Sequence, residues 1–361
     1  EEDEMKRRRF TKVVAVAAVL AMVLGMTACS GKSDSDADKK DSKKKTESDS
    51  GKHTDIYESA SELYKEGGKN KVGITVIDNV IPHCQAFIEG AKSVIEENGD
   101  EAVILDPGFD AVVQASNIDD FVAQGCVGVV CETIDGKALI TCTQNAVDAG
   151  VMVASADFPF GEGFEDLVCS QTMTPNEEAG EVLAEKMFED VGEGANVVIL
   201  ATPNSGSQAR ADGFRTVCKK NKMNIIFDGD GGGEVELANS VMQDLLQAND
   251  KIDAVICSND EQAIGAYTAA ESAGRADEVK CYGFDGAPEA IEFILKGQEA
   301  ASLGQQPYEM GKQTALDLYK ALKGEDIGAA IKYTPYKVIT KDNAEVRKET
   351  YYNGDPDYKF E

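Results

Sequence analysis

Residues 254–266 read Ala-Val-Ile-Cys-Ser-Asn-Asp-Glu-Gln-Ala-Ile-Gly-Ala and contain a complete change from strand to turn to helix. Four apolar residues come first, a polar turn follows, and apolar residues then recur at helical spacing. Continuous apolar runs of this length are typical of strands in a parallel sheet that is buried on both faces. The stretch therefore predicts one βα unit, and the same alternation returns along most of the chain.

Ten short apolar runs, separated by turns and helical stretches, continue this pattern from residue 70 onward. The expected strands are residues 72–77, 102–105, 128–130, 151–154, 167–169, 197–200, 225–227, 254–257, 279–283 and 301–303. The clearest helices are expected over 85–97, 177–188, 237–246 and 264–273. Ten strands exceed the usual sheet of about four to six. We therefore expect an α/β fold of two doubly wound parallel-sheet lobes, with a ligand in the cleft between them.

Composition narrows the classes of function. The chain has 361 residues, of which 42% are hydrophobic and 28% charged, and a net charge of −29. This length and apolar content suit about two compact domains of ~150 residues. So acidic a surface is repelled by phosphates, which disfavours nucleic acid as a partner. With only His53 and His83 and no Trp, we expect no His-centred catalysis, no metal site and no cofactor.

The N-terminal region predicts export. Basic residues 6–9 precede an uncharged apolar run at 13–26, which is too short to span a bilayer and suits a signal peptide. Small residues before Cys29 resemble the bacterial lipoprotein box, which implies cleavage after residue 28 and lipid on Cys29; the alternative is an uncleaved anchor. We take Met5 as the start of translation. Residues 29–69 are expected to form a flexible tether, in which 30–52 are almost entirely polar.

Eight cysteines remain after Cys29, and none forms a CxxC pair. Zinc ribbons and thioredoxin-type chemistry both lack their required spacing. Most of the eight stand beside apolar residues, so we expect small buried hydrophobic side chains, although one or two disulfides stay open as an alternative.

Polar and aromatic residues follow the expected strands, and in parallel α/β sheets ligands bind beyond these carboxyl ends. Carboxylates accept hydrogen bonds from hydroxyl groups, amides and guanidinium groups donate them, and an aromatic ring packs on the C–H face of a sugar. This mixture predicts a neutral polyhydroxy ligand without a phosphate cradle. The candidate residues are Asp78, Asn79, His83, Asp157, Phe158, Gln208, Arg210, Asn259, Phe284, Asp285 and Gln305.

Three motifs occur in order: Ala-Arg-Ala-Asp-Gly-Phe at 209–214, the stretch at 254–266, and Gly-Phe-Asp-Gly at 283–286. With these motifs the chain, over residues 70–341, resembles the type I periplasmic sugar-binding proteins of ABC transporters, in their ribose-binding branch. The resemblance implies two lobes joined by three hinge crossovers and closing on a sugar. The implied segments are lobe 1 at 70–171 plus 306–334, lobe 2 at 172–305 plus 335–350, and a tail at 351–361.

The resemblance also implies roles for single residues. Asn259, Asp285 and Gln305 fall on sugar hydrogen-bonding positions, Asp157 on an acidic position after the fourth strand, Phe284 on a cleft-lining aromatic, and Arg210 on an arginine beside the cleft. The structural alternatives are a helix cap for Asn259, a turn for Asp285 and a salt bridge for Arg210.

The chain departs from the family pattern at several positions. Gln208 stands where a ligand-binding arginine is expected, and Phe158 replaces the arginine that pairs with Asp157. His83 and Cys84 follow Pro82 in place of aromatic residues, and residues 229–233 are glycine-rich where the family has a stacking phenylalanine. Any of Phe109, Phe158 and Phe160 is expected to supply the missing ring face.

These features predict a non-enzymatic, monomeric, extracytoplasmic lipoprotein on the outer face of the cell membrane. It is expected to capture a monosaccharide or sugar-like polyol and deliver it to an ABC permease. The alternative is a receptor module that presents a sugar or autoinducer-like furanose to a sensor kinase or chemoreceptor. A sugar hydrolase using Asp157 and Asp285 is disfavoured, as are a dinucleotide loop at 229–233 and calcium sites at Asp34–Asp38 or Asp228–Glu234.

Overall fold

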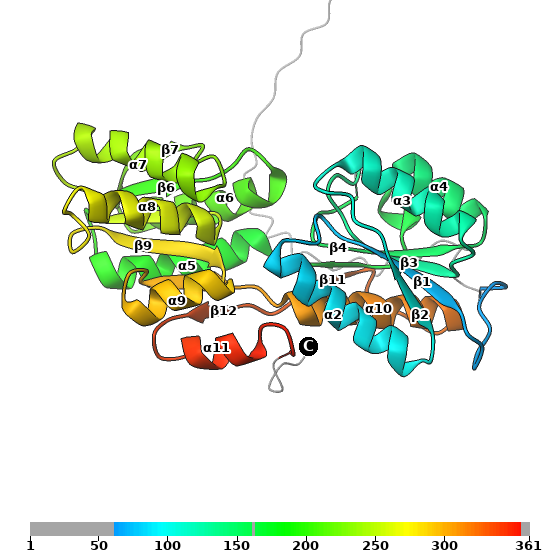
Figure 1. Ribbon diagram of the computed structural model, residues 1–361. Helices are drawn as coiled ribbons and strands as arrows, with labels where there is room; N and C mark the ends of the chain where they lie inside the picture. Colours follow the sequence, from blue (N-terminus) through cyan, green and yellow to red (C-terminus); the bar gives the residue numbers. More distant parts are fainter. Residues whose placement is uncertain (1–60, 161–162, 355–361) are drawn as a thin grey trace, which may run out of the picture. The chain divides into compact units, whose positions relative to one another are not determined.

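The computed structural model describes residues 61–160 and 163–354. Over these residues the strands form two six-stranded sheets, each interleaved with helices (Figure 1). Every strand pair is parallel except one at the edge of the second sheet. The expectation of two doubly wound α/β lobes is therefore confirmed.

Lobe 1 is the sheet that begins the described chain, together with its helices. In spatial order its strands are β11 (Ile331–Tyr333), β5 (Gln171–Met173), β4 (Met152–Ala156), β3 (Gly128–Glu132), β1 (Lys71–Thr75) and β2 (Glu101–Ile104). Its helices are α2 (Pro82–Glu97), α3 (Ala111–Ala123), α4 (Ile140–Asp148) and α10 (Pro307–Lys323). A short 3-10 turn, η2 (Glu165–Leu167), precedes β5.

Lobe 2 is the second sheet with its helices. In spatial order its strands are β12 (Lys337–Ile339), β10 (Ala301–Gly304), β9 (Lys280–Asp285), β8 (Ala254–Cys257), β6 (Asn196–Leu200) and β7 (Asn224–Gly229). Its helices are α5 (Asn176–Val191), α6 (Ser205–Lys220), α7 (Val235–Ala248), α8 (Asp260–Ser272), α9 (Pro288–Lys296) and α11 (Ala344–Thr350). Strand β12 is the antiparallel partner of β10.

Three short segments run between the sheets: 174–175 after β5, 305–306 after β10, and 334–336 after β11. The hydroxyl oxygens of Thr174 and Thr334 lie 3.3 Å apart, so a hydrogen bond joins two of these segments. Strands β10 and β11 belong to different sheets, although only helix α10 lies between them in the sequence. All three segments begin where a strand ends, at the edge of each sheet where ligands bind in this class of fold.

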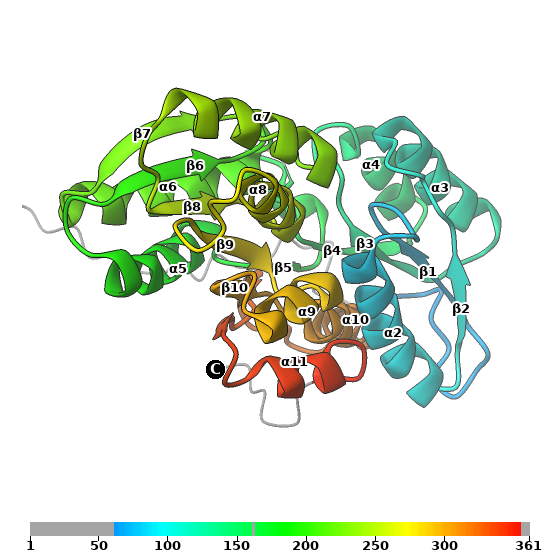
Figure 2. The ribbon, with the colours of Figure 1, turned by 60° about the vertical axis from the view of Figure 1, so that its left-hand side comes forward.

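Both faces of each sheet are covered by helices, as Figure 2 shows from a second direction. In lobe 1, residues of α2 and α10 pack on one face of the sheet and residues of α3 and α4 on the other. In lobe 2 the corresponding pairs are α5 with α6 and α7 with α8. Strands β3 and β4 are buried along their full length, which explains why their sequences are almost continuously apolar. The eight cysteines of the described chain are buried and free.

The fifth expected strand is displaced. Residues 167–169 contain the end of η2 and a buried extended segment, and the strand itself is Gln171–Met173. Leu167, Val168 and Cys169 are apolar because they are buried in the core, whereas Gln171 is buried with its side chain accepting a hydrogen bond from the Phe160 amide at 2.9 Å. Hydrophobicity therefore marked the wrong residues.

The last residues of the predicted tether are structured. The Tyr64 ring packs edge-on against Tyr319, with ring centroids 6.0 Å apart, and the Ser61 amide donates to the Leu322 carbonyl oxygen at 3.0 Å. A flexible segment over all of 29–69 is therefore too long at its C-terminal end, because the partly buried Tyr64 packs against the core of lobe 1.

The predicted signal peptide, the lipidated Cys29 and most of the tether lie outside the described residues. Across 61–160 and 163–354, no helix combines the length and the apolar character that crossing a membrane requires.

Candidate ligand-binding site

A cavity of about 710 Å³ is lined by residues that follow strands of both lobes. This volume is within the ~300–1,000 Å³ of typical small-molecule sites. Seven of the residues expected from the sequence line it: His83, Asp157 and Phe158 from lobe 1, and Arg210, Asn259, Asp285 and Gln305 from lobe 2 or its crossover. The rule that ligands bind beyond the carboxyl ends of strands therefore brings residues far apart in sequence into one cavity.

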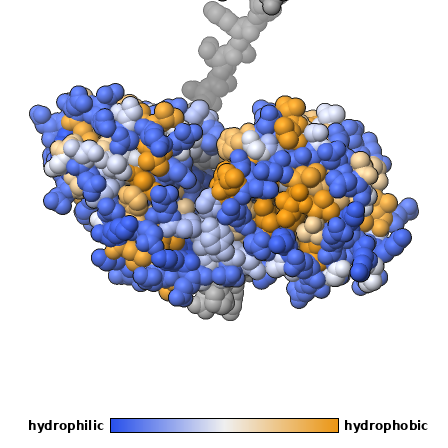
Figure 3. All heavy atoms as spheres, viewed as in Figure 1, coloured by the Kyte–Doolittle hydropathy of each residue, from blue (hydrophilic) through white to orange (hydrophobic). Residues whose placement is uncertain are grey.

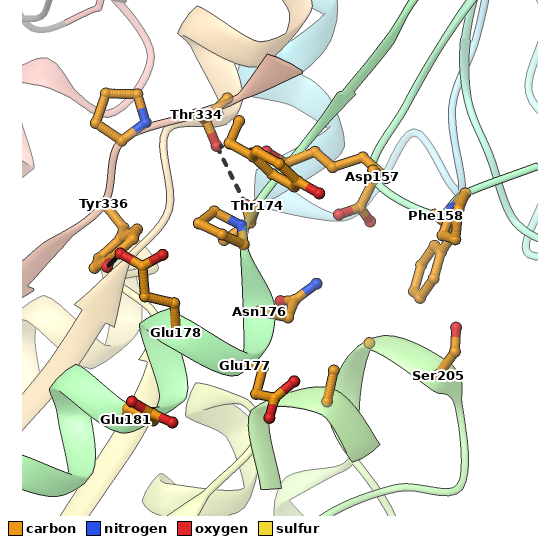
Figure 4. A pocket seen from close by; sticks show the side chains of 17 residues that line it. Asp157, Phe158, Thr174, Asn176, Glu177, Glu178, Glu181, Ser205, Thr334 and Tyr336 are labelled. Carbon is orange, nitrogen blue, oxygen red and sulfur yellow. Dashed lines mark hydrogen bonds between the residues drawn. The ribbon is translucent and has the colours of Figure 1, made fainter. Parts of the chain in front are cut away.

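A second depression of about 840 Å³ adjoins the first and shares Asp157, Phe158, Asn176 and Gly206 with it. Figure 4 shows its lining, in which Thr174, Thr334 and Tyr336 come from the crossover segments and Glu177, Glu178 and Glu181 from α5. Phe158 points toward the start of α6 near Ser205 in the same view. We take the smaller cavity as the ligand site because it holds the buried charged groups described next.

Arg210 is the centre of the lobe 2 side. Its Nη1 donates to Asp285 Oδ1 at 3.1 Å and to the Ser258 carbonyl oxygen at 2.7 Å, and its Nε donates to Asn176 Oδ1 at 2.8 Å. The guanidinium carbon lies 3.8 Å from the centroid of the Phe284 ring, a cation–π distance. Four partners therefore fix the direction of this side chain before any ligand arrives.

Close helix packing sets the position of Arg210. A Cβ atom on Gly180 of α5 would lie 2.3 Å from the Arg210 carbonyl oxygen, and one on Gly213 of α6 would lie 2.2 Å from the Glu177 carbonyl oxygen. Only glycine lets the two backbones approach this closely. The crossing of α5 and α6 thus places Asn176 within reach of the Arg210 guanidinium.

Asp285 ends β9 with a φ of 119°, in the region that side chains other than glycine rarely adopt. Burial raises the pKa of Asp285 to about 7, while Arg210 acts in the opposite direction.

The orientation of the Gln305 side-chain amide is chosen so that its nitrogen faces acceptors and its oxygen faces donors. Its nitrogen then donates to Asp285 Oδ1 at 2.7 Å and its oxygen accepts from Arg210 Nη2 at 3.2 Å and Thr174 Oγ1 at 2.8 Å. Asp285, Arg210 and Gln305 form one connected network.

Asn259 caps α8, as the structural alternative from the sequence proposed. Its Oδ1 accepts from the Gln262 amide at 3.0 Å and its Nδ2 donates to the Gly233 carbonyl oxygen at 2.8 Å. Asn259 also lines the cavity, so its role as a cap does not exclude a contact with the ligand. The glycine-rich segment near 233 reaches the same cavity through this bond.

His83, Glu132 and Asp157 form the lobe 1 side of the site. Their nitrogen and carboxylate oxygen atoms lie within 4.8 Å of one another, and His83 Nε2 is 3.3 Å from Glu132 Oε1. Burial lowers the pKa of His83 to about 3, so the imidazole is neutral. Burial, with Asp157 adding to the effect, raises the pKa of Glu132 to about 8. Both oxygens of Glu132 are buried without a hydrogen-bond partner of ordinary geometry.

Glu132 is the residue that the sequence analysis missed. It ends β3, a strand of otherwise apolar and small residues, and so occupies the same kind of position as Asp157 after β4 and Asp285 at the end of β9. The expected strand stopped at residue 130, and the residues after it were not considered. A carboxylate directly after an apolar run was the available signal.

Four expected site residues do not line the cavity. Phe284 is fully buried beneath Arg210, so it supports the guanidinium instead of facing the cleft. Gln208 lies on another side of α6, with Nε2 donating to the Thr202 carbonyl oxygen at 2.8 Å. Asp78 closes a turn by accepting from the Val80 amide at 3.0 Å, and the Asn79 amide nitrogen donates to Asp106 at 3.2 Å.

The aromatic lining comes from Phe158 and Phe109, whereas Phe160 is 2% exposed and belongs to the core. Phe109 is 66% exposed, beside the exposed Val112 and Val113 at the start of α3. Figure 3 shows apolar residues gathered on the lobe 1 half of the visible face. The ring faces that a sugar would need are therefore on the lobe 1 side.

Comparisons with known proteins agree with this geometry. The family model described as the periplasmic binding protein domain matches residues 72–326. The chain is 28% identical to the ribose import binding protein of Salmonella typhimurium over 258 residues, which cover 71% of this chain and 85% of that protein.

Two solved structures show the same fold. An ABC transporter periplasmic solute-binding protein from Actinobacillus succinogenes with bound D-allose has a TM-score of 0.72 and 22% identity, covering 77% of this chain and all of that chain. One from Bacillus halodurans with bound myo-inositol has a TM-score of 0.71 and 19% identity, covering 79% and 99%.

Proposed function

We propose, from the premise that this chain belongs to the periplasmic binding protein domain family, that it captures a monosaccharide or sugar-like polyol and delivers it to an ABC importer. The observation that carries the proposal is the Arg210–Asp285–Gln305 network, which opens on a cavity lined by both lobes. The names of relatives and of solved structures, which include ribose, allose and myo-inositol, support the ligand class.

The mechanism is capture by closure. A ligand that contacts both lobes stabilises the arrangement in which it is enclosed, and it shifts the population by its differential affinity for that arrangement. Asp285 and Gln305 accept from and donate to ligand hydroxyls on one side, while Asp157 accepts on the other. Each ligand hydroxyl left buried without a partner costs about 1–3 kcal/mol, so the placement of these groups sets specificity.

The test is calorimetric titration of the protein after denaturation and refolding, which removes carried ligand. The panel contains pentoses, hexoses and cyclitols. We expect one-to-one saturable binding to at least one of them, lost in Asp285→Ala and retained in Asp212→Ala, since Asp212 pairs with Arg215 on the α6 surface. A folded protein that binds no member of the panel would refute the proposed ligand class.

We also propose that the mature protein is a monomer held at the outer face of the membrane by lipid on Cys29. The support is the sequence at 13–29, which has the order of a lipoprotein signal peptide. Labelled fatty acid should be incorporated by the full chain and not by Cys29→Ser. Light scattering of the Cys29→Ser protein should give the mass of one chain; equal labelling of both forms, or a dimer mass, contradicts the proposal.

A further inference from the structure

The ligand cavity is lined by more acidic than basic side chains. Among its lining residues in the described chain, four are acidic, namely Asp157, Glu234, Glu261 and Asp285, and one is basic, Arg210. Glu132 adds a fifth carboxyl group directly behind the lining, within 4.8 Å of the donor atoms of His83 and Asp157. A cavity for a neutral sugar needs no such excess, because hydroxyl groups carry no charge to balance it.

Arg210 forms an ion pair on the lobe 2 side, and on the lobe 1 side its charge only partly opposes the rise that burial causes in the pKa of Asp157. It pairs with Asp285 at 3.1 Å and is held there by Asn176, Ser258 and Phe284. In the part of the chain that the structure describes, no cation forms an ion pair with Asp157. The next residue, Phe158, lines the cavity and offers a ring face, which also attracts cations.

The surroundings of Glu132 give a second, independent indication that a ligand group binds on the lobe 1 side. The side chain of Glu132 is fully buried, neither of its oxygens makes a hydrogen bond of ordinary geometry, and its Oε1 lies 3.3 Å from His83 Nε2 on the side of Asp157. A buried carboxyl group without a partner is costly unless another group satisfies it. A packing role alone would be served by an apolar residue at the end of this apolar strand.

We propose that the ligand is an amine-bearing sugar or aminocyclitol, whose ammonium group binds Asp157 against Phe158, with Glu132 and neutral His83 behind it. The inference rests on the proposed function, because it names the class of ligand for the same cavity. Asp157 contacts the ammonium group, whereas Glu132 acts through its charge and by orienting His83.

The number of protons released when the ligand binds is a second measurement that tests the proposal. Burial and Asp157 raise the pKa of Glu132 to about 8, and the groups that face it are His83 and Cys84 from α2 and Asp157 after β4. At pH 7 Glu132 therefore holds a proton in the ligand-free protein. An incoming ammonium group favours the carboxylate, so binding should release protons to the buffer.

The experiment titrates the full protein, stripped of carried ligand, with sets that differ at one carbon: D-glucose, D-glucosamine and N-acetyl-D-glucosamine; the galactose and mannose equivalents; and myo-inositol with an inosamine. We expect at least one amine to bind about tenfold or more tightly than both its hydroxyl and its acetamido counterparts. A hydrogen bond to a charged group contributes more free energy than a neutral one, and the difference corresponds to a change in affinity of this size. Binding of that amine should release protons when buffers of different ionisation enthalpy are compared.

Three variants locate the effect. Asp157→Asn keeps the shape of a residue whose φ is 69°, a conformation that asparagine tolerates well, and Glu132→Gln removes the buried carboxyl group that would ionise on binding. Both should reduce the ratio of amine to hydroxyl affinity about tenfold or more. Glu101→Gln makes the same chemical change at an exposed position of β2 that does not line the cavity, and it should leave that ratio within about twofold, because solvent and salt screen its charge.

The outcomes separate the two proposals. If the neutral sugars bind as tightly as their amines, the charge inference is wrong and the sugar-capture proposal stands. If no member of any set binds, both are wrong. If Zn²⁺ or Mn²⁺ alone binds the cluster and Asp157→Asn abolishes that binding, the positive charge comes from a metal ion and the amine assignment is overturned.

Discussion

Replacing Glu132 by glutamine should remove part of the pH dependence of stability in the ligand-free protein. Glu132 is 0% exposed, and its pKa rises from 4.5 to about 8 on folding, mainly because of burial. Since the folded protein binds this proton more tightly than the unfolded chain, the stabilisation is fully present below about pH 4.5. It is lost as the pH rises through about 8.

The size of the effect follows from that window. Each pH unit between the two pKa values changes the free energy of unfolding by roughly 1.4 kcal/mol per titrating group. Between pH 5 and pH 7, wild type should therefore lose about 2–3 kcal/mol more stability than Glu132→Gln. Coupling to Asp157 spreads part of this change over two groups, so the difference between the two proteins is the quantity to compare.

The assay is urea unfolding at constant ionic strength at pH 5, 6, 7 and 8, with the free energy of unfolding extrapolated to water. Glu101→Gln makes the same chemical change at an exposed position of strand β2 in the same sheet, and its curve should run parallel to wild type. If the Glu132→Gln curve also runs parallel to wild type, Glu132 is ionised in the folded protein and the reasoning about its burial is wrong.

The succession of strands and helices was predictable because buried parallel strands must be apolar, and this rule identified nine of the ten expected strands. The rule failed where a buried strand contains a polar residue. Gln171 lies inside the sheet because its side chain has a hydrogen-bond partner, so a polar residue begins the real strand β5. Strands β11 and β12 are three residues each and partly exposed, which leaves no apolar run to detect.

The sequence indicated which segments of the chain form the site, but it did not indicate which side chains in those segments face the cavity. Gln208 and Arg210 are two residues apart on α6, about 200° around the helix, so they cannot both face the same cavity. Nothing in the local sequence says which of them does; the approach of α5 at Gly180 and Gly213 decides it. Phe284 illustrates the same limit, because successive side chains in a strand alternate between faces and its neighbour Asp285 takes the cavity side.

Three further predictions test the lobe 2 side. Arg210→Met should weaken sugar binding about 100-fold or more by titration calorimetry, since it leaves Asp285 buried without its cation; a change below tenfold would contradict the network. Gly180→Ala should lower the free energy of unfolding in urea by about 1–3 kcal/mol, because the new Cβ meets the Arg210 backbone at 2.3 Å; unchanged stability would refute the close approach. Asn259→Ala should cost about 1 kcal/mol of stability through the lost cap, whereas Asn259→Asp keeps the cap and should cost less; equal losses would speak against capping.

The two sides of the proposed site differ in what they leave for a ligand to satisfy. On lobe 2, Arg210, Asp285 and Gln305 already satisfy one another, so this side is organised before binding and should contribute affinity for hydroxyl groups of many sugars. On lobe 1, Asp157 forms no ion pair within residues 61–160 and 163–354 and Glu132 makes no hydrogen bond of ordinary geometry there, and these groups favour only a ligand that completes them. Specificity arises where the wrong ligand leaves buried polar groups unpaired. Changes of ligand preference should therefore follow substitutions at positions 83, 132, 157 and 158, while substitutions in the lobe 2 network should weaken all ligands alike.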